Sequence, residues 1–192
     1  MRDCKLFARF VLINILIVFQ RCMSLINFPG KASLSPIQSH LPPPLPPRAI
    51  IGYANWGQCD EKILKAVEEG VNVVIWFSID LAISSEGKPV VARGPDMDCV
   101  ARIVASIKAL YPDVIHLISI GGWNSPHPDT TLPPEVVYGS WKDWNCKIAA
   151  RPLLGFNGFD GIDWDVEGND TPSSPYNNFS VGIAQFMLYY NV

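Results

Sequence analysis

From Ile50 onward the chain repeats one pattern, in which a short apolar run is followed by a segment with helical hydrophobic periodicity. The apolar runs cover residues 50–55, 71–78, 114–120 and 159–168. The helical segments cover residues 60–70, 96–110, 135–150 and 174–191. Strands that alternate with helices pair in parallel through right-handed crossovers. The sequence therefore predicts an α/β fold, with a small hairpin through residues 85–88 after the second strand.

Acidic and apolar side chains alternate in the fourth of these runs. In an extended strand one face would carry the acids Asp163, Asp165 and Glu167. The opposite face would carry Ile162, Trp164 and Val166. Such an apolar face favours an interior strand covered by helices over a solvated edge strand. Crowded carboxylates repel one another and lose solvation, so we expect at least one to keep its proton near neutral pH.

Metal binding is an alternative use of these acids. The sequence Asp163-x-Asp165-x-Glu167-Gly168 begins like a calcium loop, but its twelfth position is Ser174 rather than the glutamate that such a loop requires. A metal-dependent hydrolase that uses the three acids as oxygen ligands predicts loss of activity with a chelator. We favour a site without a metal or another cofactor.

The third apolar run ends in Ser119-Ile120-Gly121-Gly122-Trp123. Ligands of α/β sheets bind at the carboxyl ends of the strands, which makes this stretch a candidate binding segment. Paired glycines also form ordinary tight turns after strands. The sequence contains no Gly-x-Gly-x-x-Gly and no Walker motif, so it does not support a nucleotide phosphate site. The net charge of −3 and the lack of a basic stripe argue against nucleic acid as a partner.

Two segments of different character precede the repeats. Residues 1–24 place basic residues before the apolar run 10–19, which is shorter than the roughly 20 residues of a membrane span and is typical of a signal peptide. We expect a secreted protein without stable membrane insertion, with an uncleaved signal anchor as the alternative. Residues 25–49 form a Pro-rich linker, and its proline run at 41–47 is alternatively a ligand for a proline-recognition domain.

An odd number of cysteines remains after removal of the leader. The cysteines that remain are Cys59, Cys99 and Cys146, and their spacing matches no zinc site. We therefore expect at most one disulfide among them and one free thiol.

Two of the motifs described above occur together in one known family. Ser119-x-Gly121-Gly122 and Asp160-x-x-Asp163-x-Asp165-x-Glu167 resemble the signature motifs of glycoside hydrolase family 18, the chitinases and their relatives. The resemblance covers residues 50–192. It implies a TIM-type (β/α)8 barrel that hydrolyses β-1,4 linkages beside N-acetylglucosamine. A complete barrel needs about 250 residues, so this segment would supply about four of the βα units.

The resemblance also implies roles for the residues of the second motif. Glu167 would protonate the leaving oxygen, and Asp165 would orient the acetamido group, whose carbonyl oxygen attacks the anomeric carbon. Asp163 would share charge or a proton with its neighbour, and Asp160 would be structural.

Other residues of the resemblance would shape the cleft. Ser119, Gly121 and Gly122 would form its floor, and Tyr53 and Trp123 can stack on sugar faces, as can Trp56. The implied partner is a chitin-like polysaccharide. A truncated barrel would expose its sheet edges, so we expect self-association. A chitinase-like protein that binds carbohydrate without cleaving it remains the alternative to an enzyme.

Overall fold

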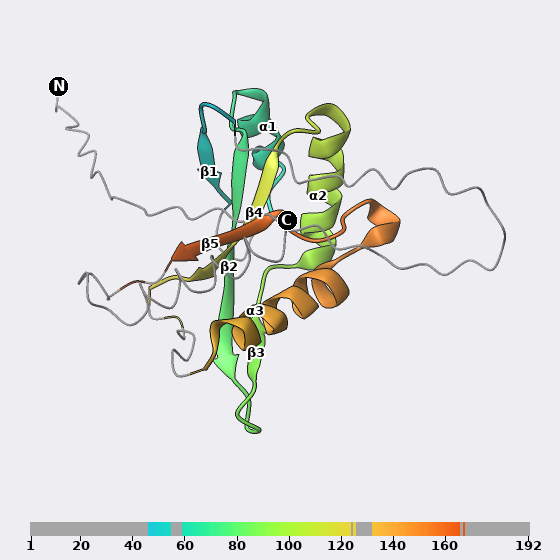
Figure 1. The fold of residues 1–192 in the computed structure, drawn as a ribbon. Coiled ribbons are helices and arrows are strands. Elements are labelled where there is room, and N and C mark those ends of the chain that lie inside the picture. Colours follow the sequence, from blue (N-terminus) through green and yellow to red (C-terminus); the bar gives the residue numbers. More distant parts are fainter. Residues whose placement is uncertain (1–45, 55–58, 124, 126–131, 166, 168–192) are drawn as a thin grey trace, which may run out of the picture.

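The computed structural model describes residues 46–54, 59–123, 125, 132–165 and 167 (Figure 1). The leader at 1–24, most of the linker at 25–49, Trp56 and the helix expected at 174–191 lie outside the described residues. The strands of the described part are β1 (Ile51–Tyr53), β2 (Val73–Ile83), β3 (Pro89–Arg93), β4 (Ile115–Gly121) and β5 (Gly161–Asp165). Its helices are α1 (Lys62–Glu68), α2 (Met97–Leu110) and α3 (Pro134–Asp143), with a π-helical segment at Trp144–Ala149 and a 3-10 turn at Pro152–Leu154.

The sheet has the order β1-β2-β4-β5, and each of these neighbouring pairs is parallel. Strand β3 lies off this path and pairs with β2 in the antiparallel direction. This arrangement confirms the mixed α/β fold with a parallel sheet, and it confirms the expected hairpin after the second strand.

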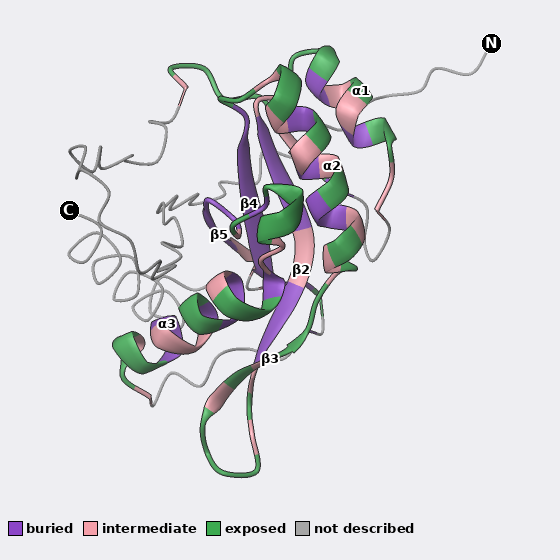
Figure 2. Cartoon of the chain, turned by 90° about the vertical axis from the view of Figure 1, so that its right-hand side faces the viewer, coloured by how far each residue is buried: buried purple, intermediate pink, exposed green. Residues whose placement is uncertain are grey.

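The helices cover one face of the sheet, as Figures 1 and 2 show. The main hydrophobic cluster contains buried side chains from α1, α2 and α3 together with sheet residues such as Val74, Trp76, Ile118 and Ile162. The alternate sheet residues form a second, smaller cluster that contains Val73, Ile75, Ile115 and Leu117, with Ile51 packed against it. Side chains on the two faces of the sheet therefore have different surroundings, as the period of two in a strand requires.

Two expected elements are shorter than the sequence suggested. The fourth strand, expected over 159–168, ends at Asp165, and Glu167 lies in a turn beyond it. The reason lies in β4, whose pairing with β5 ends at Gly121. Gly121 and Gly122 have φ angles of 113° and 109°, so the backbone turns there and the pairing with β5 stops. The chain of α3 also changes at Trp144 from α-helix to π-helix, instead of continuing as one helix to residue 150.

The helix ends follow local signals. Asp96 caps α2, because its Oδ1 accepts hydrogen bonds from the backbone N–H groups of Asp98 (3.0 Å) and Cys99 (3.2 Å). Asp60 accepts from the N–H of Lys62 at 2.9 Å at the start of α1. Gly70, with a φ of 112°, follows the end of α1. No helix among the described residues is long and apolar enough to cross a membrane.

The cysteines depart from the sequence expectation. Cys59 and Cys99 form a disulfide with a Cα–Cα distance of 5.9 Å, which ties the start of α1 to the first turn of α2. Cys146 is also disulfide-bonded. The expectation of one free thiol among these three cysteines is therefore wrong for this structure.

Candidate functional site

The candidate site lies at the carboxyl ends of the parallel strands. In the register of β4 and β5, Ser119 is opposite Asp163 and Gly121 is opposite Asp165. Tyr53 is the last residue of β1, two positions after Ile51, which packs in the smaller cluster. By the alternation of side chains, Tyr53, Ser119 and Asp163 therefore point to the face of the sheet that the helices do not cover.

Asp163 is almost fully buried, with 2% of its surface exposed. Its Oδ2 accepts a hydrogen bond of 2.9 Å from the hydroxyl of Ser119. Burial raises the pKa of the Asp163 carboxyl, and the hydrogen bond from Ser119 opposes that rise. Its other oxygen, Oδ1, is buried and has no hydrogen-bond partner among the described residues. A buried acid with one oxygen unpartnered is well suited to holding or exchanging a proton.

Asp165 is half-buried at the end of β5. Burial raises its pKa to about 6, and the nearby charges of Glu167 and Asp163 contribute to this rise. The three acids of the motif therefore lie within electrostatic range of one another. The pKa values of Asp163 and Asp165 are both shifted toward the protonated form, and burial contributes more to these shifts than mutual repulsion.

Tyr53 lies beside these acids with 50% of its surface exposed. Burial of part of its ring, followed by the charges of Asp163 and Asp165, raises the pKa of its phenol to about 12. The hydroxyl therefore stays protonated at any physiological pH and can donate a hydrogen bond. Its ring meets the edge of Phe77, with ring centroids 6.5 Å apart.

The glycine pair and Trp123 lie on the same edge of the sheet. The N–H of Gly122 donates a 2.7 Å hydrogen bond to the carbonyl of Asp165, which ties the turn after β4 to the end of β5. Trp123 follows with 69% of its surface exposed, so its indole is not part of the core. Tyr53, at the end of β1, and Trp123, shortly after the end of β4, thus present aromatic surface to solvent.

Asp160 lies apart from the other acids, at the start of β5. Its Oδ2 accepts a 2.9 Å hydrogen bond from the N–H of His116, and its own N–H donates to the carbonyl of His116 at 2.8 Å. Lys108 of α2 forms an ion pair with the same carboxyl at 3.4 Å. Asp160 therefore fixes the alignment of β4 and β5, which in turn places Ser119 against Asp163.

Two buried polar groups were not predicted from the sequence. The indole N–H of Trp76 donates a 3.2 Å hydrogen bond to Nδ1 of His116, on the face covered by helices. Burial, with a smaller effect from Lys108, lowers the pKa of His116 to about 3. Asp80, 3% exposed, is paired with Arg93 of the hairpin. The only local signal for either is a polar residue inside an apolar run, which does not reveal its partner.

The described residues hold no group of three or more His, Cys, Asp or Glu side chains placed to bind a metal ion. The geometry instead combines carboxyl groups of raised pKa with a protonated phenol and exposed aromatic rings. Such a set can transfer protons and bind a polar ligand that has apolar faces.

The described part thus defines a mixed α/β protein with a parallel sheet and an acidic site at the strand ends. Solved structures that are similar include the Group IV chitinase of Ostrinia furnacalis, with a TM-score of 0.48 and 16% identity over 76% of this chain and 42% of that chain. This enzyme was also solved in complex with allosamidin. The chitinase domain of the spore coat protein CotE from Clostridium difficile has a TM-score of 0.45 and 17% identity, over 80% of this chain and 43% of that domain.

A third similar structure is the xylanase-alpha-amylase inhibitor protein XAIP-I in complex with trehalose. It has a TM-score of 0.46 and 22% identity, over 73% of this chain and 52% of that one. The chain thus spans less than half the length of the two chitinase structures. No protein-family model matches the chain, and the search of curated proteins found no match.

Proposed function

We propose that the acidic site belongs to a glycosidase that hydrolyses β-1,4 linkages of chitin or of other N-acetylglucosamine glycans. The observation that carries the proposal is the group formed by Asp163, Asp165 and Glu167 beside Tyr53. Two of these carboxyls have raised pKa values, and the phenol is held protonated. Carboxyls that favour the protonated form, beside a protonated phenol, support a site at which protons are held and exchanged.

In the proposed reaction Glu167 protonates the glycosidic oxygen. At neutral pH most Asp165 is ionised, since its pKa is about 6. Its carboxylate can then accept a hydrogen bond from the acetamido N–H while the carbonyl oxygen of that group attacks the anomeric carbon. The negative charge of Asp165 then stabilises the positive oxazolinium ion. In the same proposal Asp163 takes up or shares a proton with Asp165, which is supported by its hydrogen bond from Ser119 and by its effect on the pKa of Asp165.

Glycan binding without cleavage is the second candidate function. It is favoured by the exposure of Tyr53 and Trp123, because stacking on sugar rings needs these aromatic faces and no proton transfer. The two candidates share a ligand and differ only in the use of Glu167.

The test is hydrolysis and binding of chitin oligomers by the full 192-residue chain. The proposal expects turnover that Glu167→Gln abolishes, while calorimetry still detects binding. Glu135→Gln, at an exposed position of α3, is the matched control and should leave turnover unchanged. Binding without turnover in the unmodified chain would favour the second candidate, and the absence of both would refute the glycan assignment.

We further propose that the chain is exported through residues 1–24 and that residues 50–192 form part of a (β/α)8 barrel whose open edges favour self-association. The apolar run within the leader and the parallel order of β1, β2, β4 and β5 support these proposals. Sequencing the N-terminus of the protein in the culture medium tests the first. Sedimentation of the purified chain tests the association, which a stable monomer would contradict.

A further inference from the structure

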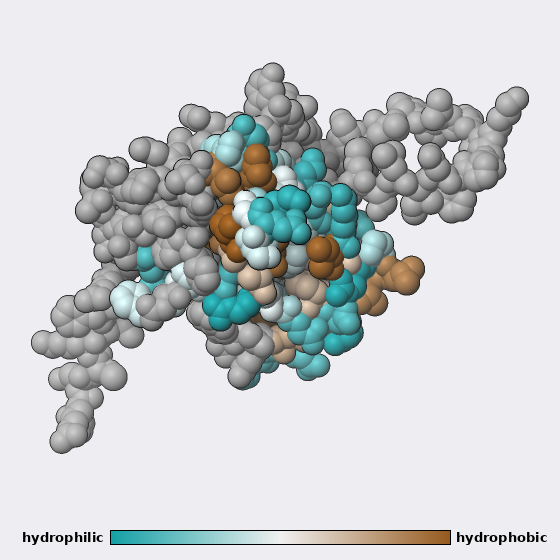
Figure 3. Space-filling view, turned by 90° about the horizontal axis from the view of Figure 1, so that it is seen from below, coloured by the Kyte–Doolittle hydropathy of each residue, from teal (hydrophilic) through white to brown (hydrophobic). Residues whose placement is uncertain are grey.

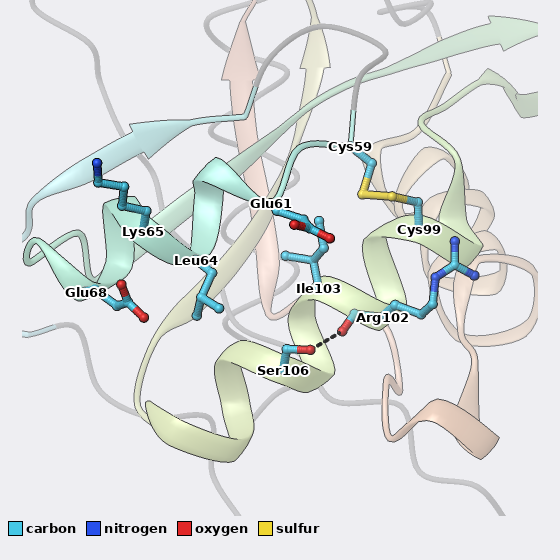
Figure 4. A pocket seen from close by; sticks show the side chains of 9 residues that line it. All are labelled: Cys59, Glu61, Leu64, Lys65, Glu68, Cys99, Arg102, Ile103 and Ser106. Atoms are coloured by element: carbon cyan, nitrogen blue, oxygen red, sulfur yellow. Dashed lines mark hydrogen bonds between the residues drawn. A yellow bond between two sulfur atoms is a disulfide. The ribbon is translucent and has the colours of Figure 1, made fainter.

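A pocket of about 540 Å³ lies between α1 and α2 (Figure 4). Its lining consists of Cys59, Glu61, Leu64, Lys65, Glu68, Cys99, Arg102, Ile103 and Ser106. The disulfide between Cys59 and Cys99 forms one end of the pocket, and Lys65 and Glu68 lie at the other end (Figure 4). None of the acids of the candidate site lines this pocket.

The disulfide is open to this pocket rather than enclosed in the core. Both cysteines are partly exposed, and both line the cavity. Thiol–disulfide exchange requires a thiolate to reach one sulfur along the line of the S–S bond, so access is the first condition for reaction. A pocket of this volume admits a small thiol without unfolding of the chain.

The surroundings of the two sulfurs are unequal. Cys99 is the third residue of α2, where the helix dipole favours a thiolate, while the N–H groups of Asp98 and Cys99 donate to the carboxylate of Asp96. Arg102, one turn further along α2, adds a positive charge within the pocket, whereas Glu61 adds a negative one (Figure 4). The nearby carboxylate of Asp98 is paired with Arg151. Cys99 is therefore the better leaving group, and attack is favoured at the sulfur of Cys59.

We propose that the bond between Cys59 and Cys99 is a thiol-exchange site that small thiols or dithiols reduce in the folded protein. The attacking thiolate forms a mixed disulfide with Cys59 and expels the Cys99 thiolate, which takes up a proton. A second thiol group then attacks the mixed disulfide and releases the Cys59 thiolate, which is protonated in turn. Two electrons pass to the protein, and the reductant leaves as its own disulfide.

Reduction has a structural consequence at the start of α1. The disulfide ties Cys59, just before α1, to Cys99 in the first turn of α2. Strand β1 itself stays attached to the sheet, for example through the hydrogen bond from the N–H of Ala54 to Ile75 (2.8 Å). Loss of the bond thus releases Cys59, just before α1, from α2 while leaving the sheet in place. This inference does not depend on the proposed glycan chemistry.

The test measures the rate of reduction in the full chain under native conditions. Dithiothreitol is added at graded concentrations, free thiols are trapped with a mass label, and peptides containing Cys59, Cys99 and Cys146 are followed separately. Exchange through the pocket predicts a rate for Cys59 and Cys99 that is first order in thiol and unchanged by low urea. A rate that saturates with thiol and rises with urea would show that reduction needs unfolding, and the proposal would be overturned.

A charge variant sharpens this test. Arg102→Gln should slow reduction by glutathione, whose attacking form carries more negative charge, by about threefold to tenfold, and should slow reduction by dithiothreitol by a smaller factor. Lys142→Gln on α3, outside the pocket, is the matched control and should change neither rate. Equal effects of the two variants would contradict the assigned role of Arg102.

Hydrogen exchange checks the structural consequence. After reduction, peptides covering residues 59–68 should exchange at least about tenfold faster, whereas those covering β4 should be unchanged. A reduced chain with hydrogen exchange unaltered throughout would show that the disulfide does not hold the start of α1 in place.

Discussion

The hydroxyl of Ser119 donates a 2.9 Å hydrogen bond to Oδ2 of Asp163, and both side chains are buried between neighbouring parallel strands. This bond stabilises the ionised carboxyl, whereas burial favours the neutral one. A residue of another strand, 44 positions earlier in the chain, therefore opposes the effect of burial on the pKa of Asp163.

Replacement of this hydroxyl should raise the pKa of Asp163 further. Ser119→Ala removes the group that favours ionisation and should lower stability at pH 7 by about 1–3 kcal/mol, with a smaller loss at pH 4. Carbon-13 NMR of the carboxyl group follows the titration directly. Ser106→Ala, which removes an exposed hydroxyl bonded to the carbonyl of Arg102 within α2, should leave the titration of Asp163 unchanged.

Neutralising Asp165 should stabilise the protein at neutral pH. Its pKa is raised to about 6, so the folded chain binds more protons than the unfolded chain between about pH 4 and 6, and stability falls as the pH rises through that window. Because the carboxyl is half-exposed and screened by solvent, Asp165→Asn should gain only about 1 kcal/mol at pH 7 and nothing near pH 3. Urea denaturation at the two pH values measures this. Asp143→Asn, which breaks an exposed ion pair with Lys147, should show no gain.

His116 should make the fold sensitive to acid. Its pKa is lowered to about 3 in the folded state, so the unfolded chain binds the extra proton first as the pH falls below about 6.5. Stability should therefore drop by about 2 kcal/mol between pH 7.5 and 5 from this group. In His116→Asn, whose amide can accept the hydrogen bond from Trp76 but does not titrate, this contribution should vanish. Parallel pH curves for the two proteins would exclude His116 as the cause.

Loss of the disulfide should destabilise the fold substantially. The 40-residue separation of Cys59 and Cys99 corresponds to about 4 kcal/mol in the chain-entropy description of a cross-link. The double variant Cys59→Ser, Cys99→Ser should lower the free energy of unfolding by about this amount. The unmodified chain with this bond reduced should unfold at nearly the same urea concentration, and a large difference between the two would point to effects other than the cross-link.

Trp123 should contribute to binding and not to folding. With 69% of its surface exposed, Trp123→Ala should leave the melting temperature within about 1 °C. If its indole stacks on sugar, the variant should bind chitin oligomers more weakly by about 0.5–1.5 kcal/mol, or roughly twofold to tenfold. Calorimetric titration measures the change. Leu153→Ala, at a fully exposed position, is the control and should bind normally.

Local signals predicted most of the fold. The cap at Asp96 and the apolar spacing of α2 define that helix within one residue, because both act over a single turn. The alternation of acids in β5 likewise follows from the period of a strand.

Structural features that depend on residues distant in the sequence were not predicted. The π-helical segment coincides with Asn145, whose side chain exchanges hydrogen bonds of 2.8 and 3.1 Å with the backbone of Phe159.

The candidate site shows the same division. The sequence pointed to Ser119 and Asp163 as members of two motifs, but only the register of β4 and β5 brings them into contact. The end of β5 at Asp165 depends on the turn of Gly121 and Gly122 in another strand, so the position of Glu167 beyond the sheet could not be read from its own segment.

The parallel strands follow one another across the sheet in the order in which they are synthesised. Each newly made strand can therefore dock onto one that is already in place, without waiting for a distant part of the chain. Among the described strands β5 comes last in the chain, so its carboxyl groups can be buried against the earlier strands of the sheet. During synthesis the carboxyl of Asp163 is thus buried only after β4 has supplied its hydrogen-bond donor, Ser119.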